Sequence, residues 1–208
     1  MSTLNVDNIN EYTTDGKVNV GHDIKLASGK SVLNSNSQQI GALVKITSGT
    51  VTSGTSINFD NCFSNDFRNY KILTNSTGTE SLEARLRAGG SDNTSSVYGS
   101  MLHYVYIESS TSSSVDRTTN GQHWRWTYQA SGGSNNVIGG EHTVYNPFES
   151  DKGTVMTGLC MAQWNNDSSL AGYMSGHYST AASFDGISIL DSAGSNWTGE
   201  VAIYGIVK

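Results

Sequence analysis

The sequence predicts an all-β protein, on three observations. Glycine, or paired serine and asparagine, interrupts nearly every window long enough for an amphipathic helix. β-Branched and aromatic residues dominate the short apolar runs between these interruptions. Several runs also alternate, as in 82–88, where leucine and alanine occupy the even positions and glutamate and arginine the odd ones. One face of such a strand lies on a core, so the pattern predicts an antiparallel β-sandwich head of jelly-roll type.

Residues 1–46 come first and carry too little apolar mass to fold alone. Their short extended runs are separated by turns around Gly16, Gly21 and Gly29, and each run offers a single apolar stripe. A segment of this size becomes ordered when neighbouring chains supply the missing wall. We therefore expect a short β shaft in which copies of the chain share one apolar axis. The predicted axis residues are Val18, Val20, Ile24, Leu26, Val32 and Ile40.

Residues 47–54 contain two glycines and no large side chain beyond Val51. This composition predicts a hinge between the shaft and the head. We place the domain boundary in this stretch, with the attachment and shaft segment in 1–46 and the sandwich head in 55–208.

The runs predicted as strands are bounded by Gly, Asn, Asp and Ser. In chain order they are 42–46, 56–59, 70–76, 81–88, 99–108, 122–130, 140–145, 154–164, 170–178, 184–190 and 199–207. Alternation within 123–128 places Trp124 and Trp126 on one face, so both are predicted in the core. Trp197 is predicted to pack at the start of the last strand.

Turn-forming residues separate these strands. Pro147, the single proline, ends the strand before it and sets a turn. The stretches 91–96, 109–114 and 131–136 are rich in Ser, Asn or Gly and are predicted to be exposed loops that join strands.

Both ends and the middle of the chain carry a resemblance to a known class of proteins. The start MSTLNVDNI, the module DIKLASGKSV, the pair YKIL and LEARLRAGG, and the closing WTGEVAIYGIVK resemble virion appendage proteins of tailed bacteriophages, especially those of marine and cyanobacterial hosts. The resemblance implies that the first residues, with Leu4, Val6 and Ile9, attach to the particle. It also implies a thin trimeric β shaft and an outward-facing β-sandwich.

Composition excludes several other classes. Charged residues make up 14% of the 208 residues, and the formal net charge is −6 with Lys and Arg scattered singly, which argues against nucleic-acid binding. No run approaches the roughly 18 apolar residues of a membrane span, and the polar start lacks the features of a signal peptide. Together with the resemblance, which implies a virion protein, these features predict that the protein is made in the host cytoplasm.

No motif points to catalysis or to a metal. The five histidines are far apart and form no H-E-x-x-H pair, no G-x-S-x-G elbow is present, and Cys62 and Cys160 have no zinc spacing. Both cysteines are predicted to be buried free thiols. We predict no metal, no cofactor and no enzyme activity. A polysaccharide depolymerase is kept as a minor alternative, because a glycosidase needs two carboxylates close together and the sequence alone does not show which carboxylates the fold brings together.

Carbohydrate recognition is the chemistry that this composition supports best. Aromatic faces stack on the CH surfaces of sugars, and Asn, Asp and His hydrogen-bond their hydroxyls. The candidate ligand-binding residues are Trp164, Asn165, Asn166 and Asp167, at a turn between two predicted strands. The opposing interpretation is that this Trp covers the edge of the sandwich and that the Asn-Asp pair closes a hairpin.

These observations together predict a homotrimeric fibre that contacts other virion proteins through its N-terminus. Its head is predicted to bind a polysaccharide or receptor on the host surface. A capsid fibre or decoration protein with a mainly structural role is the alternative, because nothing in the residues separates a tail from a capsid location.

Overall fold

The computed structural model describes residues 43–78, 81–107, 112–127, 137–165 and 168–207, without the side chains of Ile107, Trp164, Asn165 and Ser168. The chain divides into two units, Met1–Ile40 and Gly41–Lys208, and every described residue belongs to the second. The predicted attachment residues and the predicted shaft axis therefore lie outside the described residues.

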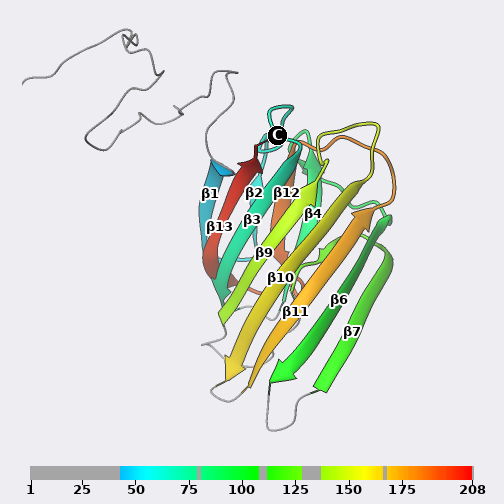
Figure 1. The fold of residues 1–208 in the computed structure, drawn as a ribbon. Coiled ribbons are helices and arrows are strands. Elements are labelled where there is room, and N and C mark those ends of the chain that lie inside the picture. The colour runs from blue at the N-terminus through cyan, green and yellow to red at the C-terminus, as the bar shows by residue number, and fades with distance from the viewer. Residues whose placement is uncertain (1–42, 79–80, 108–111, 128–136, 166–167, 208) are drawn as a thin grey trace, which may run out of the picture. The chain divides into compact units, whose positions relative to one another are not determined.

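All regular structure in the described residues is β, which confirms the predicted fold class. The strands are β1 (Leu43–Gly54), β2 (Ser56–Phe59), β3 (Asn69–Thr77), β4 (Leu82–Ala88), β5 (Ser91–Asp92), β6 (Tyr98–Ile107), β7 (Ser112–Gly121), β8 (Trp124–Arg125), β9 (Val137–Tyr145), β10 (Thr154–Asn165), β11 (Ser168–Tyr178), β12 (Gly186–Asp191) and β13 (Trp197–Ile206). Each predicted run overlaps one of these strands (Figure 1).

The strands form two antiparallel sheets. The larger sheet has the order β1-β13-β3-β9-β10-β11-β6-β7, and the smaller has β2-β12-β4-β5, with β8 also paired to β4. Without β5 and the hairpins β6–β7 and β10–β11, the orders become β1-β13-β3-β9 and β2-β12-β4-β8. These are the two four-stranded sheets of a jelly roll, in which the first strand pairs with the last. The two hairpins extend the larger sheet by four strands beyond β9.

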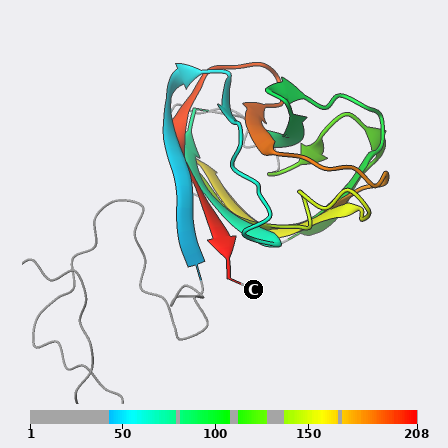
Figure 2. The same cartoon turned by 90° about the horizontal axis from the view of Figure 1, so that it is seen from above.

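The larger sheet curves around the smaller one, so its outer face is convex (Figure 2). The two sheets enclose one hydrophobic core, and Trp124, Trp126 and Trp197 are among its fully buried side chains, as predicted. Cys62 and Cys160 are both buried and neither forms a disulfide, which confirms that prediction as well. Burial raises the pKa of the Cys62 thiol to about 12, which keeps it protonated and unreactive.

The predicted hinge at 47–54 is wrong. These residues belong to β1, which pairs with β13 from Leu43↔Ile206 to Gly54↔Trp197. Val51 faces the core and is 5% exposed. Two glycines and the lack of large side chains beyond Val51 predict a flexible connection, but the free edge of β13 provides a hydrogen-bonding partner that holds this sequence as a strand. The boundary of the compact unit therefore precedes β1.

Two further predictions need correction. The predicted loop 109–114 overlaps β7, an edge strand whose side chains are mostly exposed and therefore lack the apolar alternation of a half-buried strand. In β4 the odd positions were predicted to face solvent, but Glu83 and Arg87 are buried, while Ala88 is exposed. Asp60 and Asp92 contact Arg87, and His123 contacts Glu83, so polar partners cover this face.

Candidate functional site

The outer face of the larger sheet carries most of the large apolar side chains that the head leaves exposed. Met161 is 63% exposed and Leu159 is 60% exposed. Both lie on β10, where outward side chains alternate with the buried Met156, Cys160 and Ala162. The exposed apolar residues on β3, β6, β7, β9, β10 and β11 are Leu73, Met101, Val115, Val137, Val155, Leu159, Met161 and Tyr173.

Strand register places several of these side chains in one row across six strands. The row runs Leu73↔Glu141↔Leu159↔Tyr173↔His103↔Val115. Five strand spacings of about 4.8 Å give it a length of roughly 24 Å. Contiguous exposed apolar surface on a soluble protein commonly marks a site that another molecule covers. We call this row, together with Val155 and Met161, the outer band.

Charge is sparse on the outer band. Lys71 Nζ lies 2.5 Å from Glu141 Oε1, so the single carboxylate of the row is neutralised by a neighbour on β3. The imidazole of His103 lies between Tyr173 and Val115 in the row. The band thus presents aliphatic, aromatic and thioether groups with few charges, a surface suited to a ligand or partner that is itself largely uncharged at the contact.

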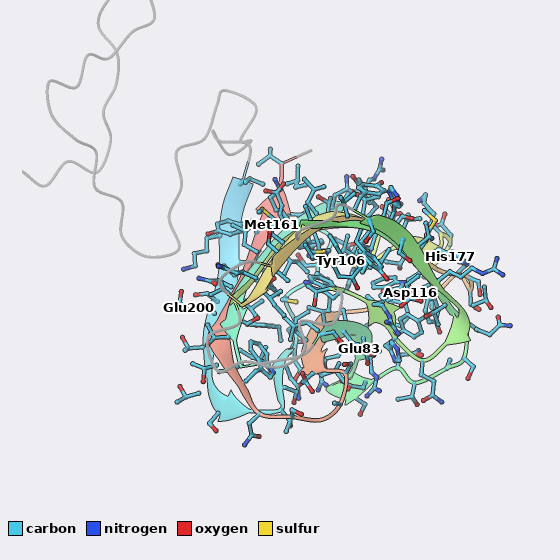
Figure 3. All side chains as sticks on the ribbon, turned by 90° about the horizontal axis from the view of Figure 1, so that it is seen from below. Glu83, Tyr106, Asp116, Met161, His177 and Glu200 are labelled. Atoms are coloured by element: carbon cyan, nitrogen blue, oxygen red, sulfur yellow. The ribbon has the colours of Figure 1, made fainter. Side chains whose placement is uncertain are left out.

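Two shallow grooves lie on opposite sides of the row along the strand direction, one beside Val155 and the other beside Met161. The Arg117 groove, with a volume of about 390 Å³, is lined by Met101, Arg117, Thr119, Val155, Ser175 and His177 together with neighbouring backbone. The Met161 groove, of about 480 Å³, is lined by Val137, Gly139, Met161, Ala162, Gln163 and Ser169. Figure 3 labels Met161 and His177, one from each groove, on the outer side of the larger sheet.

The predicted turn around Trp164 lies between Gln163 and Ser169 in the sequence, and both of these residues line the Met161 groove. β10 ends at Asn165, β11 begins at Ser168, and these two residues pair, so the two strands form the hairpin that the sequence predicted. Trp164 and Asn165 are the last residues of β10, and their side chains lie outside the described ones, as do Asn166 and Asp167. The structure therefore places the turn at the end of a hairpin, and the ligand-binding role of its side chains stays a prediction.

The turn lies at the end of the sandwich opposite Leu43. Leu43 pairs with Ile206, and the row of paired residues continues from Asn69 through Tyr145 to Val155, at the start of β10. The turn follows the other end of β10, roughly 33 Å away at 3.3 Å per residue. Figure 1 shows the C-terminal end of the chain beside the start of β1.

The side chain of His142 has a lowered pKa but faces the core. Its ring lies 3.8 Å from that of Trp126, and Nε2 lies 3.1 Å from the carbonyl oxygen of Trp126. Complete burial lowers the pKa of His142 to about 3. A neutral imidazole without access to solvent has no substrate to act on, so this residue is part of the packing.

The other polar side chains of the described residues were searched for a metal site and for catalytic pairs. Among the described residues, no group of three or more His, Cys, Asp or Glu side chains gathers to hold a metal ion. His123 Nε2 lies 2.9 Å from Glu83 Oε1 at the smaller sheet. In the part of the chain that the structure describes, no helix is long and apolar enough to cross a membrane.

We compared the chain with protein families, curated proteins and solved structures. No family model matches the chain, and neither a curated protein nor a solved structure matches it.

The outer band and the Arg117 groove were not predicted from the sequence. Alternation within β10 and β11 signals one buried face, but it does not distinguish an exposed apolar face from a second covered one. Arg117 lies in a run of Ser and Thr where no apolar period assigns it to a face. Only the register of β6, β7 and β11 brings it beside Met101 and Ser175.

Proposed function

We propose that this protein is a homotrimeric virion appendage whose jelly-roll head binds the surface of the host cell. The observation that carries the proposal is the outer band, because it gathers exposed apolar side chains on one face, with Leu159 beside Tyr173 across two strands and Met161 two residues further along β10. A binding partner explains such a surface better than catalysis does. The resemblance of both chain ends to appendage proteins of tailed bacteriophages supports the virion location.

Trimer formation in this proposal depends on the N-terminal segment. Burial of Val18, Val20, Ile24, Leu26, Val32 and Ile40 on a shared axis would contribute roughly 1.5 to 3 kcal/mol for each fully buried side chain. Three copies of the head would then act together, and multivalent contact with a repetitive host surface raises the overall affinity without any new contact.

The turn around Trp164 is the proposed host-binding site. It lies at the end of the sandwich opposite Leu43. The adjacent Met161 groove offers apolar side chains beside the amide of Gln163 and the hydroxyl of Ser169. This combination suits a saccharide, which presents CH faces and hydroxyl groups together.

A capsid fibre or decoration protein is the second candidate function. The outer band also suits contact with another protein, because interface cores are apolar and poor in charge. Electron microscopy of particles that carry labelled copies of the protein separates the two locations. Release of sugars from host polysaccharide by the purified protein would instead support the depolymerase alternative.

Substitution of Trp164 tests the host-binding site. We expect Trp164→Ala to weaken adsorption of the labelled full-length chain to a panel of marine cyanobacterial strains without lowering its melting temperature. Trp124→Ala is the matched control, because Trp124 is fully buried and its loss should lower the melting temperature. A parallel loss of adsorption and melting temperature in Trp164→Ala would mean that this side chain is structural.

A further inference from the structure

We propose that the Arg117 groove binds an acidic saccharide, with the guanidinium of Arg117 paired to the sugar carboxylate. This inference rests on the proposed function and adds a ligand class and a second contact site to it. The site lies on the side of the head, on strands β6, β7, β10 and β11.

Strand register brings the groove residues together on adjacent strands. Met101 pairs with Arg117 on one side and with Ser175 on the other, so these three outward positions form a row across β7, β6 and β11. His177, two residues beyond Ser175, pairs with Gly99 and with Val155. The side chains therefore converge on one groove from four strands.

Gly99 keeps the groove shallow and open. A Cβ atom at this position would lie 2.3 Å from Cε1 of His177, so the imidazole lies directly over the glycine backbone. A larger residue would force the ring away from the sheet. The ring instead forms part of the groove lining, where its nitrogens can hydrogen-bond a ligand hydroxyl.

Arg117 differs from the other arginines of the chain. Arg68, Arg85, Arg87 and Arg125 each lie within ion-pair distance of a carboxylate. For Arg117, no carboxylate among the described residues lies within that distance, and its side chain is exposed. The groove lining contains no Asp or Glu. On a chain of net charge −6, this groove thus presents a cation that no described carboxylate pairs with.

The chemistry of the lining selects the ligand class. The planar guanidinium fork donates two parallel hydrogen bonds to a carboxylate. Thr119 and Ser175 supply hydroxyls for sugar hydroxyl groups, and Met101 and Val155 supply apolar contact for a CH face. A nucleic acid would require several cations along its phosphates, and the groove has one. A saccharide with one carboxylate per unit matches this arrangement.

The test compares carboxylated and neutral oligosaccharides on the full-length protein by calorimetry. We expect oligomers of galacturonic and glucuronic acid to bind more tightly than the corresponding galactose and glucose oligomers. Arg117→Gln should lower affinity for the acidic oligomers by about tenfold or more, and should leave weak binding of neutral ones unchanged. Arg68→Gln, which changes an exposed arginine outside the groove, is the matched control and should bind as the unmodified protein does.

A second variant tests the geometry of the groove. Gly99→Ala should displace the His177 ring and weaken binding of the acidic oligomers, while melting temperatures show whether each variant is folded. Equal binding of acidic and neutral oligomers, or unchanged affinity in a folded Arg117→Gln variant, would overturn the proposal.

Adsorption to host cells distinguishes failure of this inference from failure of the proposed function. Cells that bind the unmodified protein while the oligomer tests are negative would overturn the acidic-saccharide site alone. A protein that adsorbs to no strain and is absent from purified particles would overturn the proposed function, whatever the oligomers show.

Discussion

The guanidinium of Arg87 joins three separate parts of the chain at the outer side of the smaller sheet. Nε donates to Asp60 Oδ1 at 2.7 Å, and Nη1 donates to Ser188 Oγ at 3.0 Å and to Asp92. Burial lowers the pKa of Arg87, but the hydrogen bond to Asp60 and the charges of Asp60 and Asp92 outweigh it and raise the pKa above its usual value. The group is therefore charged at all ordinary pH values.

Replacement of Arg87 should destabilise the head. Arg87→Met keeps the volume but leaves the carboxylate of Asp60 without its partner and leaves Asp92 with only the longer ion-pair contact to Arg85 at 3.8 Å, and we expect the free energy of unfolding to fall by about 2 to 3 kcal/mol. This lies below the usual cost for a fully buried pair because both carboxylates are partly exposed. Urea unfolding measures the change. Arg68→Met is the control, because the side chain of Arg68 is 58% exposed and its ion pair should contribute far less.

His142 makes the stability of the head depend on pH. Its pKa is about 3 in the folded state, against 6.5 for the unperturbed group, because burial disfavours the charged ring. Between these values the unfolded chain binds a proton that the folded chain does not, so this contribution to stability decreases as the pH falls from 6.5 towards 3.

The slope of stability against pH tests this effect. We expect the free energy of unfolding to decrease by up to about 1.4 kcal/mol per pH unit from this group between pH 6 and 4. His142→Gln should be less stable at pH 7 but should lose stability less steeply on acidification. Urea titrations at several pH values give both slopes, and equal slopes would show that His142 has no such role.

At the scale of elements, β1 determines where the folded head begins. β1 pairs with β13 along its length and contributes Val51 to the core. Its position beside the last strand closes the jelly roll, since the first and last strands are neighbours in the larger sheet. A chain without β1 would expose the edge of β13 to solvent.

Two truncations test this role of β1. A chain that begins at Leu43 retains every strand of the head and should unfold cooperatively in urea. A chain that begins at Thr55 lacks β1 and should be unfolded or strongly destabilised. Similar stability of the two chains would restore the hinge interpretation of 47–54.

In the whole molecule, the proposed trimer assigns association to the first unit and the folded head to the second. The first unit carries the predicted axis, and the second folds around its own core. We expect sedimentation equilibrium to show a trimer for the full-length chain and a monomer for the chain that begins at Leu43. A stable monomer of the full-length chain would contradict the predicted shaft, and a trimer of the truncated chain would assign association to the head.

Much of the fold could be predicted because most strands carry their own local pattern. Alternation in 82–88 and in 123–128 identified a strand and two core tryptophans, and turn residues marked most boundaries. β1 and β7 could not be assigned correctly because Gly and Ser, which do not favour strands, are interspersed among the Val and Thr residues that do. Neighbouring strand edges decide their conformation.

Part of the candidate site could likewise be predicted from local sequence, and part of it could not. The hairpin around Trp164 follows from two adjacent apolar runs and a polar turn, all local in the sequence. The outer band and the Arg117 groove depend on pairing between strands far apart in the chain, such as Leu73 with Glu141 and Gly99 with His177. No local pattern specifies such a pairing.

Residue type and a period of two are enough to predict an antiparallel β-sandwich and the tryptophans that enter its core, because both are local properties of the chain. The neighbours of each outward side chain depend instead on the tertiary structure, and so does the position of Arg117 beyond ion-pair distance of any described carboxylate. The physical reason is that strand order and register set these distances, and both arise from packing of the whole chain.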